Sequence, residues 1–133
     1  MIYSKNVREV DKQLKKIFDL IDDYLENNYG NTYKRHPNRP GRGETTNKAS
    51  DGLFNVGASF TAGYGSLYGR GYAVDVDFAT LDNVSEKVQM DIEEEVAELL
   101  REIIPQYFPN QDVRVSRDGN VLKIYGELVL HKT

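Results

Sequence analysis

The sequence predicts an α+β fold in which two helices cover one face of a four-stranded, mainly antiparallel sheet. Two stretches carry apolar residues three and four positions apart, and four stretches alternate apolar and polar residues with the period of a strand. In chain order these stretches give αββαββ. Because each pattern leaves one apolar side, the simplest packing is a two-layer sandwich, formed as a single domain over residues 1–133.

The first helix is expected between Ser4 and Asn28. One apolar stripe runs along it, formed by Val7, Val10, Leu14, Ile17, Phe18, Ile21 and Leu25. Its first half is basic and its second half acidic, with the acids at Asp19, Asp22, Asp23 and Glu26. This order predicts either a plain solvated face or a dipolar face that docks antiparallel on a second copy or on a partner.

The segment 31–50 has neither period and contains two prolines and two glycines, which predicts a flexible loop. Its bases are Lys34, Arg35, Arg39, Arg42 and Lys48, and its one acid is Glu44. Loops longer than about 12–15 residues are uncommon in compact domains and are usually functional or disordered. Two interpretations stay open, a solvated mobile loop and a loop whose Arg35, Arg39 and Arg42 bind phosphate or nucleic acid.

A β-hairpin is expected next, with strands at residues 51–62 and 72–80. The side chains predicted to face the core are Phe54, Val56, Ala58, Phe60, Ala62, Tyr72, Val74, Val76 and Phe78. Asp75 and Asp77 alternate with these residues and therefore face away from the core. The glycine-rich connection permits a tight or bulged turn. Its tyrosines, Tyr64 and Tyr68, together with Tyr72, either clamp a flat ligand or cover the end of the sheet.

The second helix is expected over residues 81–104, capped by Asp82, Asn83 or Ser85 and ended by Pro105. Its acidic residues predict a solvent-facing side.

A second hairpin is expected from residues 112–116 and 121–130, because Asp118-Gly119 is a strong signal for a short turn. On its second strand, Lys123, Tyr125 and Glu127 are predicted to point away from the core. The outer sheet face would then be polar enough to face water, or to line a groove or a dimer interface.

Composition excludes several kinds of site. The chain has no cysteine, so it forms no disulfide or thiolate zinc site, and its two histidines do not suffice for a histidine-rich metal site. The net charge of -4 argues against nucleic-acid binding over the whole surface. We expect a cytoplasmic protein without a membrane-spanning segment, because neither a signal sequence nor a long apolar run occurs.

The sharpest chemical pattern is Gly65-Ser66 followed by Asp75-Val76-Asp77-Phe78. A Gly-Ser turn before an Asp-x-Asp strand resembles the core signature of the nucleotidyltransferase superfamily. This resemblance implies that Ser66 contacts phosphate and that Asp75 and Asp77 bind Mg²⁺, while Arg70 would neutralise phosphate charge. The same two aspartates are also what the solvent face of an ordinary strand provides.

The function we expect is that of a small, soluble, non-catalytic binding domain, with a protein partner or a second copy of the chain as its target and with no cofactor. At the level of architecture alone, the chain resembles secretion-type chaperones. The first alternative is binding of phosphate or nucleic acid by the loop 34–48 together with Arg70. The second is a Mg²⁺-dependent nucleotidyl or phosphoryl transferase that uses Ser66, Asp75 and Asp77.

Overall fold

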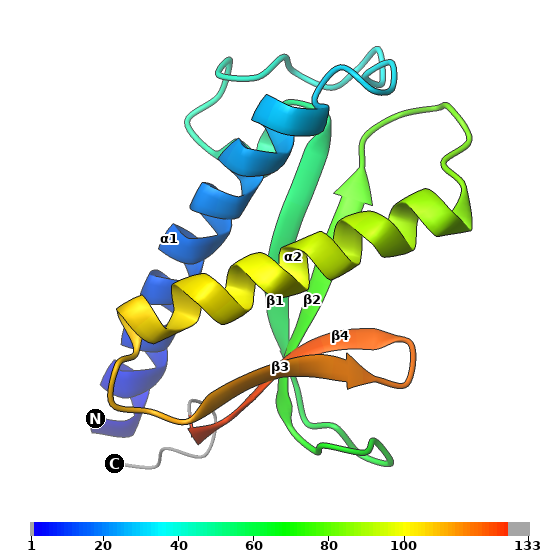
Figure 1. Cartoon of the computed structure of the whole chain (residues 1–133). Coiled ribbons are helices and arrows are strands. Elements are labelled where there is room, and N and C mark those ends of the chain that lie inside the picture. The colour runs from blue at the N-terminus through cyan, green and yellow to red at the C-terminus, as the bar shows by residue number, and fades with distance from the viewer. Residues whose placement is uncertain (1, 128–133) are drawn as a thin grey trace.

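The computed structural model describes residues 2–127, with side chains described from residue 8 onward, and confirms the α+β fold and the αββαββ order (Figure 1). The elements are α1 (Ile2–Tyr29), the short 3₁₀ helix η1 (Lys48–Ser50), β1 (Phe54–Thr61), β2 (Gly71–Phe78), α2 (Glu86–Tyr107), β3 (Val113–Asp118) and β4 (Val121–Gly126). Within the described residues, no helix combines the length and the apolar character that crossing a bilayer requires.

The four strands form one antiparallel sheet in the order β1-β2-β4-β3. The sequence left this order open. Each hairpin is fully paired, with eight residue pairs between β1 and β2 and six between β3 and β4, whereas β2 meets β4 only from Tyr72 to Val74. The two hairpins are therefore joined over a short central region, and they splay apart on either side of it (Figure 1).

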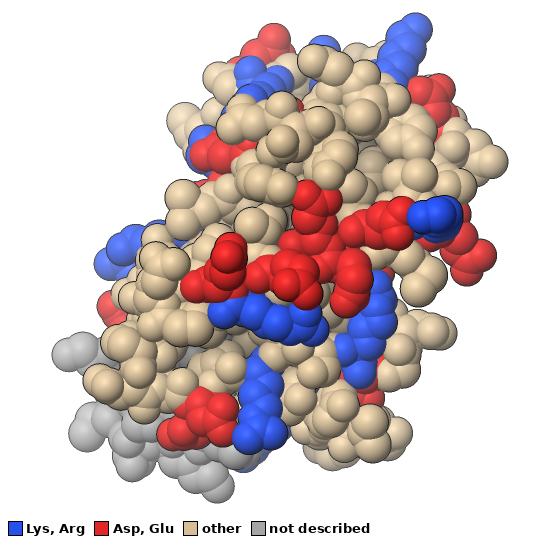
Figure 2. Space-filling model, viewed as in Figure 1, with Lys and Arg blue, Asp and Glu red and all other residues tan. Residues whose placement is uncertain are grey.

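Both helices lie on one face of this sheet, as the periodicity predicts (Figure 1). Their apolar stripes bury Ile17, Leu25, Val96 and Leu100 against the inner residues of the strands. The acidic side of α2 faces solvent, and Figure 2 shows its carboxylates gathered across the front of the molecule. Packing of apolar residues, which is non-directional, thus sets the layers, and the charges take the positions that remain.

Several boundaries differ from the prediction. Helix α1 already begins at Ile2, β1 covers only Phe54–Thr61, and β3 continues to Asp118. Strand β4 ends at Gly126, and the predicted residues 128–130 lie outside the described part. Helix α2 begins after the N-cap Ser85 but continues through Pro105 to Tyr107, so the expectation that Pro105 ends the helix is wrong. Proline removes one helical hydrogen bond. Burial of Phe108, directly after the last turn, helps to offset that loss.

Phe60 is a second correction. Its place in the alternation puts it on the core side of β1, yet 58% of the residue is exposed. It lies near the end of the strand, where its ring contacts that of Tyr72 edge to face at 5.9 Å. The alternation therefore gives the correct side of the sheet but does not show how far along the strand the helices reach.

Candidate functional site

The connection between β1 and β2, residues 62–70, lies against the β3–β4 hairpin, and we call it the clamped loop. Asp118, the last residue of β3, accepts hydrogen bonds from the backbone N–H groups of Leu67 and Tyr68, both at 2.8 Å. The ring of Tyr68 stacks on Tyr125 of β4 with a centroid distance of 4.5 Å. The loop is thus attached to the far hairpin by both polar and aromatic contacts.

A buried lysine lies beneath this loop. Only 3% of Lys123 is exposed, and its ammonium group donates to a carboxylate oxygen of Asp118 at 2.8 Å. It also donates to the carbonyl of Gly69 at 2.6 Å and to Oγ of Ser66 at 3.1 Å. These three bonds use every N–H of the ammonium group. The hydrogen bond from Lys123 is the largest cause that holds the pKa of Asp118 well below its usual range, and the two backbone N–H groups add to it.

Lys123 points away from the core, as the alternation predicts, yet its side chain is buried. Lys123 does lie on the outer face, where it pairs with Ala73 of β2 and Ser116 of β3. The clamped loop covers that part of the face and removes the side chain from water. Alternation places a side chain on one of two faces, but it carries no information about a loop that folds back over that face.

Ser66, the residue that the nucleotidyltransferase resemblance assigns to phosphate, fastens this loop internally. Its hydroxyl lies 2.6 Å from the carbonyl oxygen of Gly63, to which it donates, and it accepts from the N–H of Gly69. Gly63 has a φ of +73°, and a Cβ at this position would overlap the carbonyl of Gly69.

Large apolar side chains project from the loop and its surroundings. Tyr64 is 96% exposed and Leu67 is 75% exposed, and Phe60 and Val121 are also exposed. Of the three tyrosines singled out in the sequence, Tyr72 belongs to the hydrophobic core and Tyr68 stacks on Tyr125. The side chain of Tyr64 remains exposed to solvent.

Asp75 and Asp77 lie on the outer face of β2 and are exposed, as the alternation predicts. Burial, followed by the charge of Asp75, raises the pKa of Asp77. Gly71 and Asp77 are six residues apart on β2, which is about 20 Å along an extended strand, and the loop that carries Ser66 joins β2 at the Gly71 end. Glu127 follows the last residue of β4 and accepts a hydrogen bond from the N–H of Asp112. Among the described residues, no group of three or more His, Cys, Asp or Glu side chains is arranged to hold a metal ion.

Most basic side chains of the segment 31–50 are engaged within the fold. Arg39 donates to the backbone carbonyls of Ala49, Asp51, Gly52 and Phe54 at 2.8–3.1 Å. Arg42 and Lys48 both form ion pairs with Asp23 of α1, and Arg35 donates to the carbonyl of Arg39. Arg35 also forms a bridge with Thr80, which attaches the segment to the residues that follow β2.

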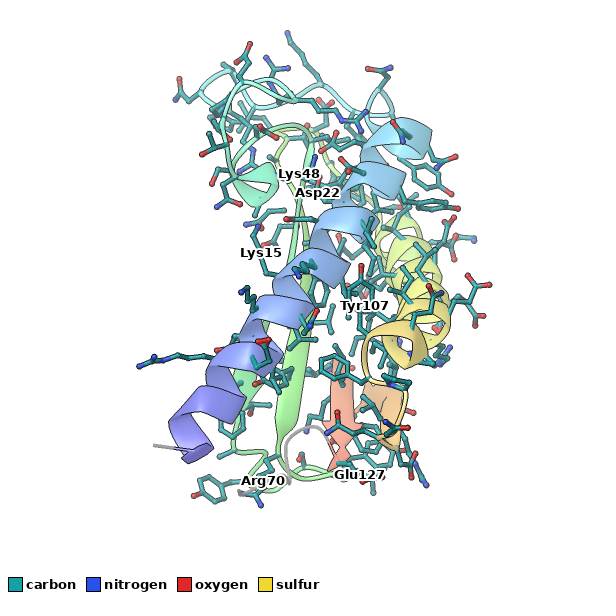
Figure 3. All side chains as sticks on the ribbon, turned by 90° about the vertical axis from the view of Figure 1, so that its left-hand side faces the viewer. Lys15, Asp22, Lys48, Arg70, Tyr107 and Glu127 are labelled. Carbon is teal, nitrogen blue, oxygen red and sulfur yellow. The ribbon has the colours of Figure 1, made fainter. Side chains whose placement is uncertain are left out.

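Arg70 does not join these arginines. It precedes β2, at the end of the hairpin opposite to the basic segment, and Figure 3 shows Arg70 and Lys48 near opposite ends of the molecule. The eight residues of β2, about 25 Å long when extended, lie between Arg70 and Thr80, which forms a bridge with Arg35. The structure thus brings Ser66 near Arg70 in one loop and Arg35, Arg39 and Arg42 together in another, but it does not unite the two groups.

Sequence reasoning also missed a group of buried carboxylates under the basic segment. Glu26 of α1 accepts from the N–H groups of Leu53 and Phe54, at 3.2 and 2.9 Å. Asp22 is only 3% exposed, and one of its oxygens has no hydrogen-bond partner within the described part of the chain. Burial, and then repulsion from Glu26 and the neighbouring acids, raises the pKa of Asp22 to about 7. A signal did exist, because Asp22 and Glu26 follow the buried Phe18 at helical steps of four.

The amino-acid sequence is similar to those of other proteins. A family model described as "Uncharacterised protein" matches residues 5–126. The chain is also 43% identical over 106 residues to a Borreliella burgdorferi protein described in the same words, and this match covers 80% of the chain and 83% of that protein. No solved structure matches the chain. Since the family model extends from α1 to the end of β4, this chain belongs to that family of uncharacterised proteins.

Proposed function

We propose that this protein is a non-catalytic interaction domain that binds a protein partner through the clamped loop. The observation that carries the proposal is the combination of a buried polar attachment, formed by Lys123, Asp118 and Ser66, with the exposed side chains of Tyr64 and Leu67 in the same loop. Exposed apolar residues that occur together mark interaction surfaces more often than isolated ones do.

The energetics support this interpretation of the attachment. A buried ion pair is a weak source of net stability, because desolvation offsets much of the attraction between its charges. It does hold a loop in one conformation. A loop that is already ordered loses less conformational entropy when a partner binds. A larger part of the interaction energy of Tyr64 and Leu67 therefore remains as binding free energy.

The test compares the wild-type protein with a double variant, Tyr64→Ser with Leu67→Ser. Both side chains are exposed, so the variant should unfold at the wild-type temperature. In quantitative affinity capture from cells that produce the protein, a specific partner should be retained by the wild type and lost by the variant. Asp75→Ser, on the exposed outer face of β2, is the matched control. If every captured protein binds the double variant as well as the wild type, the proposal is wrong.

A second candidate is binding of phosphate or nucleic acid by the basic segment. It is supported by Lys34 and Arg35, which are exposed and form no ion pair within the described part of the chain. Fluorescence anisotropy with a single-stranded oligonucleotide should then show an affinity that falls steeply with salt, and Lys34→Ala with Arg35→Ala should weaken it. An affinity that neither salt nor this double variant changes would remove the candidate.

The transferase alternative is supported by Asp75 and Asp77 alone, which lie on one exposed face of β2. For a Mg²⁺-nucleotide site, the melting temperature should rise when Mg²⁺ and ATP are added together, and Asp75→Ala with Asp77→Ala should abolish the rise. An unchanged melting temperature of the wild type would count against this chemistry.

A further inference from the structure

The two edges of the sheet differ in how their backbone groups are satisfied. The N–H of Ala79 donates to the carbonyl of Leu53, so the backbone groups of Leu53 point toward β2. In an antiparallel pair, the residues of a strand point their backbone N–H and C=O groups alternately toward the partner strand and away from it. The residues whose backbone groups face the free edge are therefore Phe54, Val56, Ala58 and Phe60.

Only the first part of this edge is covered. The N–H of Phe54 donates to Glu26, and its carbonyl accepts from Arg39 at 3.0 Å. Val56 is buried. Beyond it, the edge-facing backbone groups of Ala58 and Phe60 have no hydrogen-bond partner within the described part of the chain.

The opposite edge, β3, is protected. The guanidinium group of Arg101 donates two hydrogen bonds to the carbonyl of Val115, at 3.0 and 3.2 Å, and the strand carries Arg114 and Arg117. Charged side chains and covering groups are the usual means by which proteins prevent an edge strand from pairing with another chain. On β1, residues 56–61 read VGASFT, with no charge and no proline, and their pairing with β2 continues without a bulge.

We infer that two copies of this chain pair through this uncovered part of β1, as antiparallel strands related by a two-fold axis at Ser59. In this register the edge-facing groups of Ala58 in one copy meet those of Phe60 in the other, which gives two pairs of hydrogen bonds. The half-exposed ring of Phe60 then packs beside Ala58 of the other copy. A small residue opposite a large one allows this contact to form twice around the axis.

A second copy fits this edge better than a free peptide does. Its strand is already folded, so little conformational entropy is lost on pairing, whereas a short peptide would have to become ordered in order to form the same few hydrogen bonds. Residues 56–61 carry no charge, so this register places no like charges of β1 opposite each other.

The test uses the absence of cysteine from the sequence. Residues opposite each other at a non-hydrogen-bonded position have Cα atoms about 4.5 Å apart, which is within the range of a disulfide. Ser59→Cys should therefore form a disulfide-linked dimer in high yield under mild oxidation at low micromolar concentration. Asp75→Cys, equally exposed on the inner strand β2, is the matched control and should remain largely a monomer.

Ala58→Pro provides a second measurement. Because the N–H of Ala58 faces the free edge, proline there removes no hydrogen bond within the monomer but prevents pairing. In sedimentation equilibrium the wild type should have about twice the 15.2 kDa of one chain, and this variant should have the mass of one chain. Folding of the variant is checked by its circular dichroism.

Three results would overturn the inference. The first is a wild type that is still monomeric at about 100 µM, which would place the dissociation constant of the dimer well above that concentration. The second is equal cross-linking of the two cysteine variants, and the third is a folded Ala58→Pro variant that is still dimeric. Failure here is distinguishable from failure of the proposed partner binding, because the Tyr64→Ser, Leu67→Ser variant should keep the mass of the wild type.

Discussion

Replacing Asp22 with asparagine is expected to stabilise the protein at pH 8 and to leave its stability almost unchanged near pH 4. Asp22 is buried on α1 beside Glu26, and desolvation raises its pKa from 3.8 to about 7. Between these two values the folded state binds a proton that the unfolded state releases. The stability of the wild type must therefore fall as the pH rises through this window.

The magnitude follows from the size of the shift. About three pKa units correspond to about 4 kcal/mol between the two protonation states, at about 1.4 kcal/mol per unit. This amount is close to the whole stability of a marginal domain. Asparagine has almost the shape of aspartic acid and carries no charge, so it should remove this pH dependence.

Urea unfolding at pH 5 and pH 8 measures both effects. The wild type should lose about 3 kcal/mol between the two pH values, whereas Asp22→Asn should lose little. Asp91→Asn, which removes the same charge from an exposed ion pair with Lys87, serves as the control and should behave like the wild type. Two results would refute the reasoning: a wild type that is more stable at pH 8 than at pH 5, or an asparagine variant that is less stable than the wild type at pH 8.

Two further predictions concern side chains that hold loops in place. Lys123→Met removes the ammonium group beneath the clamped loop, so the amide protons of Leu67 and Tyr68 should exchange with solvent roughly tenfold faster or more. An unchanged exchange rate would show that Lys123 does not hold the loop. Arg39→Lys keeps the charge but loses the planar group that donates to four carbonyls, so it should lower the free energy of unfolding in urea by about 2–4 kcal/mol. A loss below about 0.5 kcal/mol would mean that these hydrogen bonds contribute little to stability.

The fold was predictable because it depends on periodic burial. The steps of three and four in α1 and α2, and the alternation in β1 and β2, each describe one continuous apolar surface, and surfaces of this kind have few ways to pack. Ser85 as the cap of α2 and the turn at Gly119, with a φ of +66°, were predictable for a related reason. Each depends only on residues a few positions away in the chain.

The candidate site depends on contacts between residues that are distant in sequence, and for that reason no periodic pattern revealed it. Lys123 lies 57 positions from Ser66 and 54 positions from Gly69, and only the return of the clamped loop over the outer face brings the three together. The same holds for Glu26, which reaches across 28 positions to the start of β1. In both places a charged residue on a regular element holds the backbone of an irregular one. Irregular segments have few partners of their own for their N–H and C=O groups, so a buried charge that supplies these bonds determines the shape of the loop. The residues that shape the surface of this protein are therefore Lys123, on the outer face of β4, and Glu26, on the buried side of α1, because each binds backbone groups far away in the sequence.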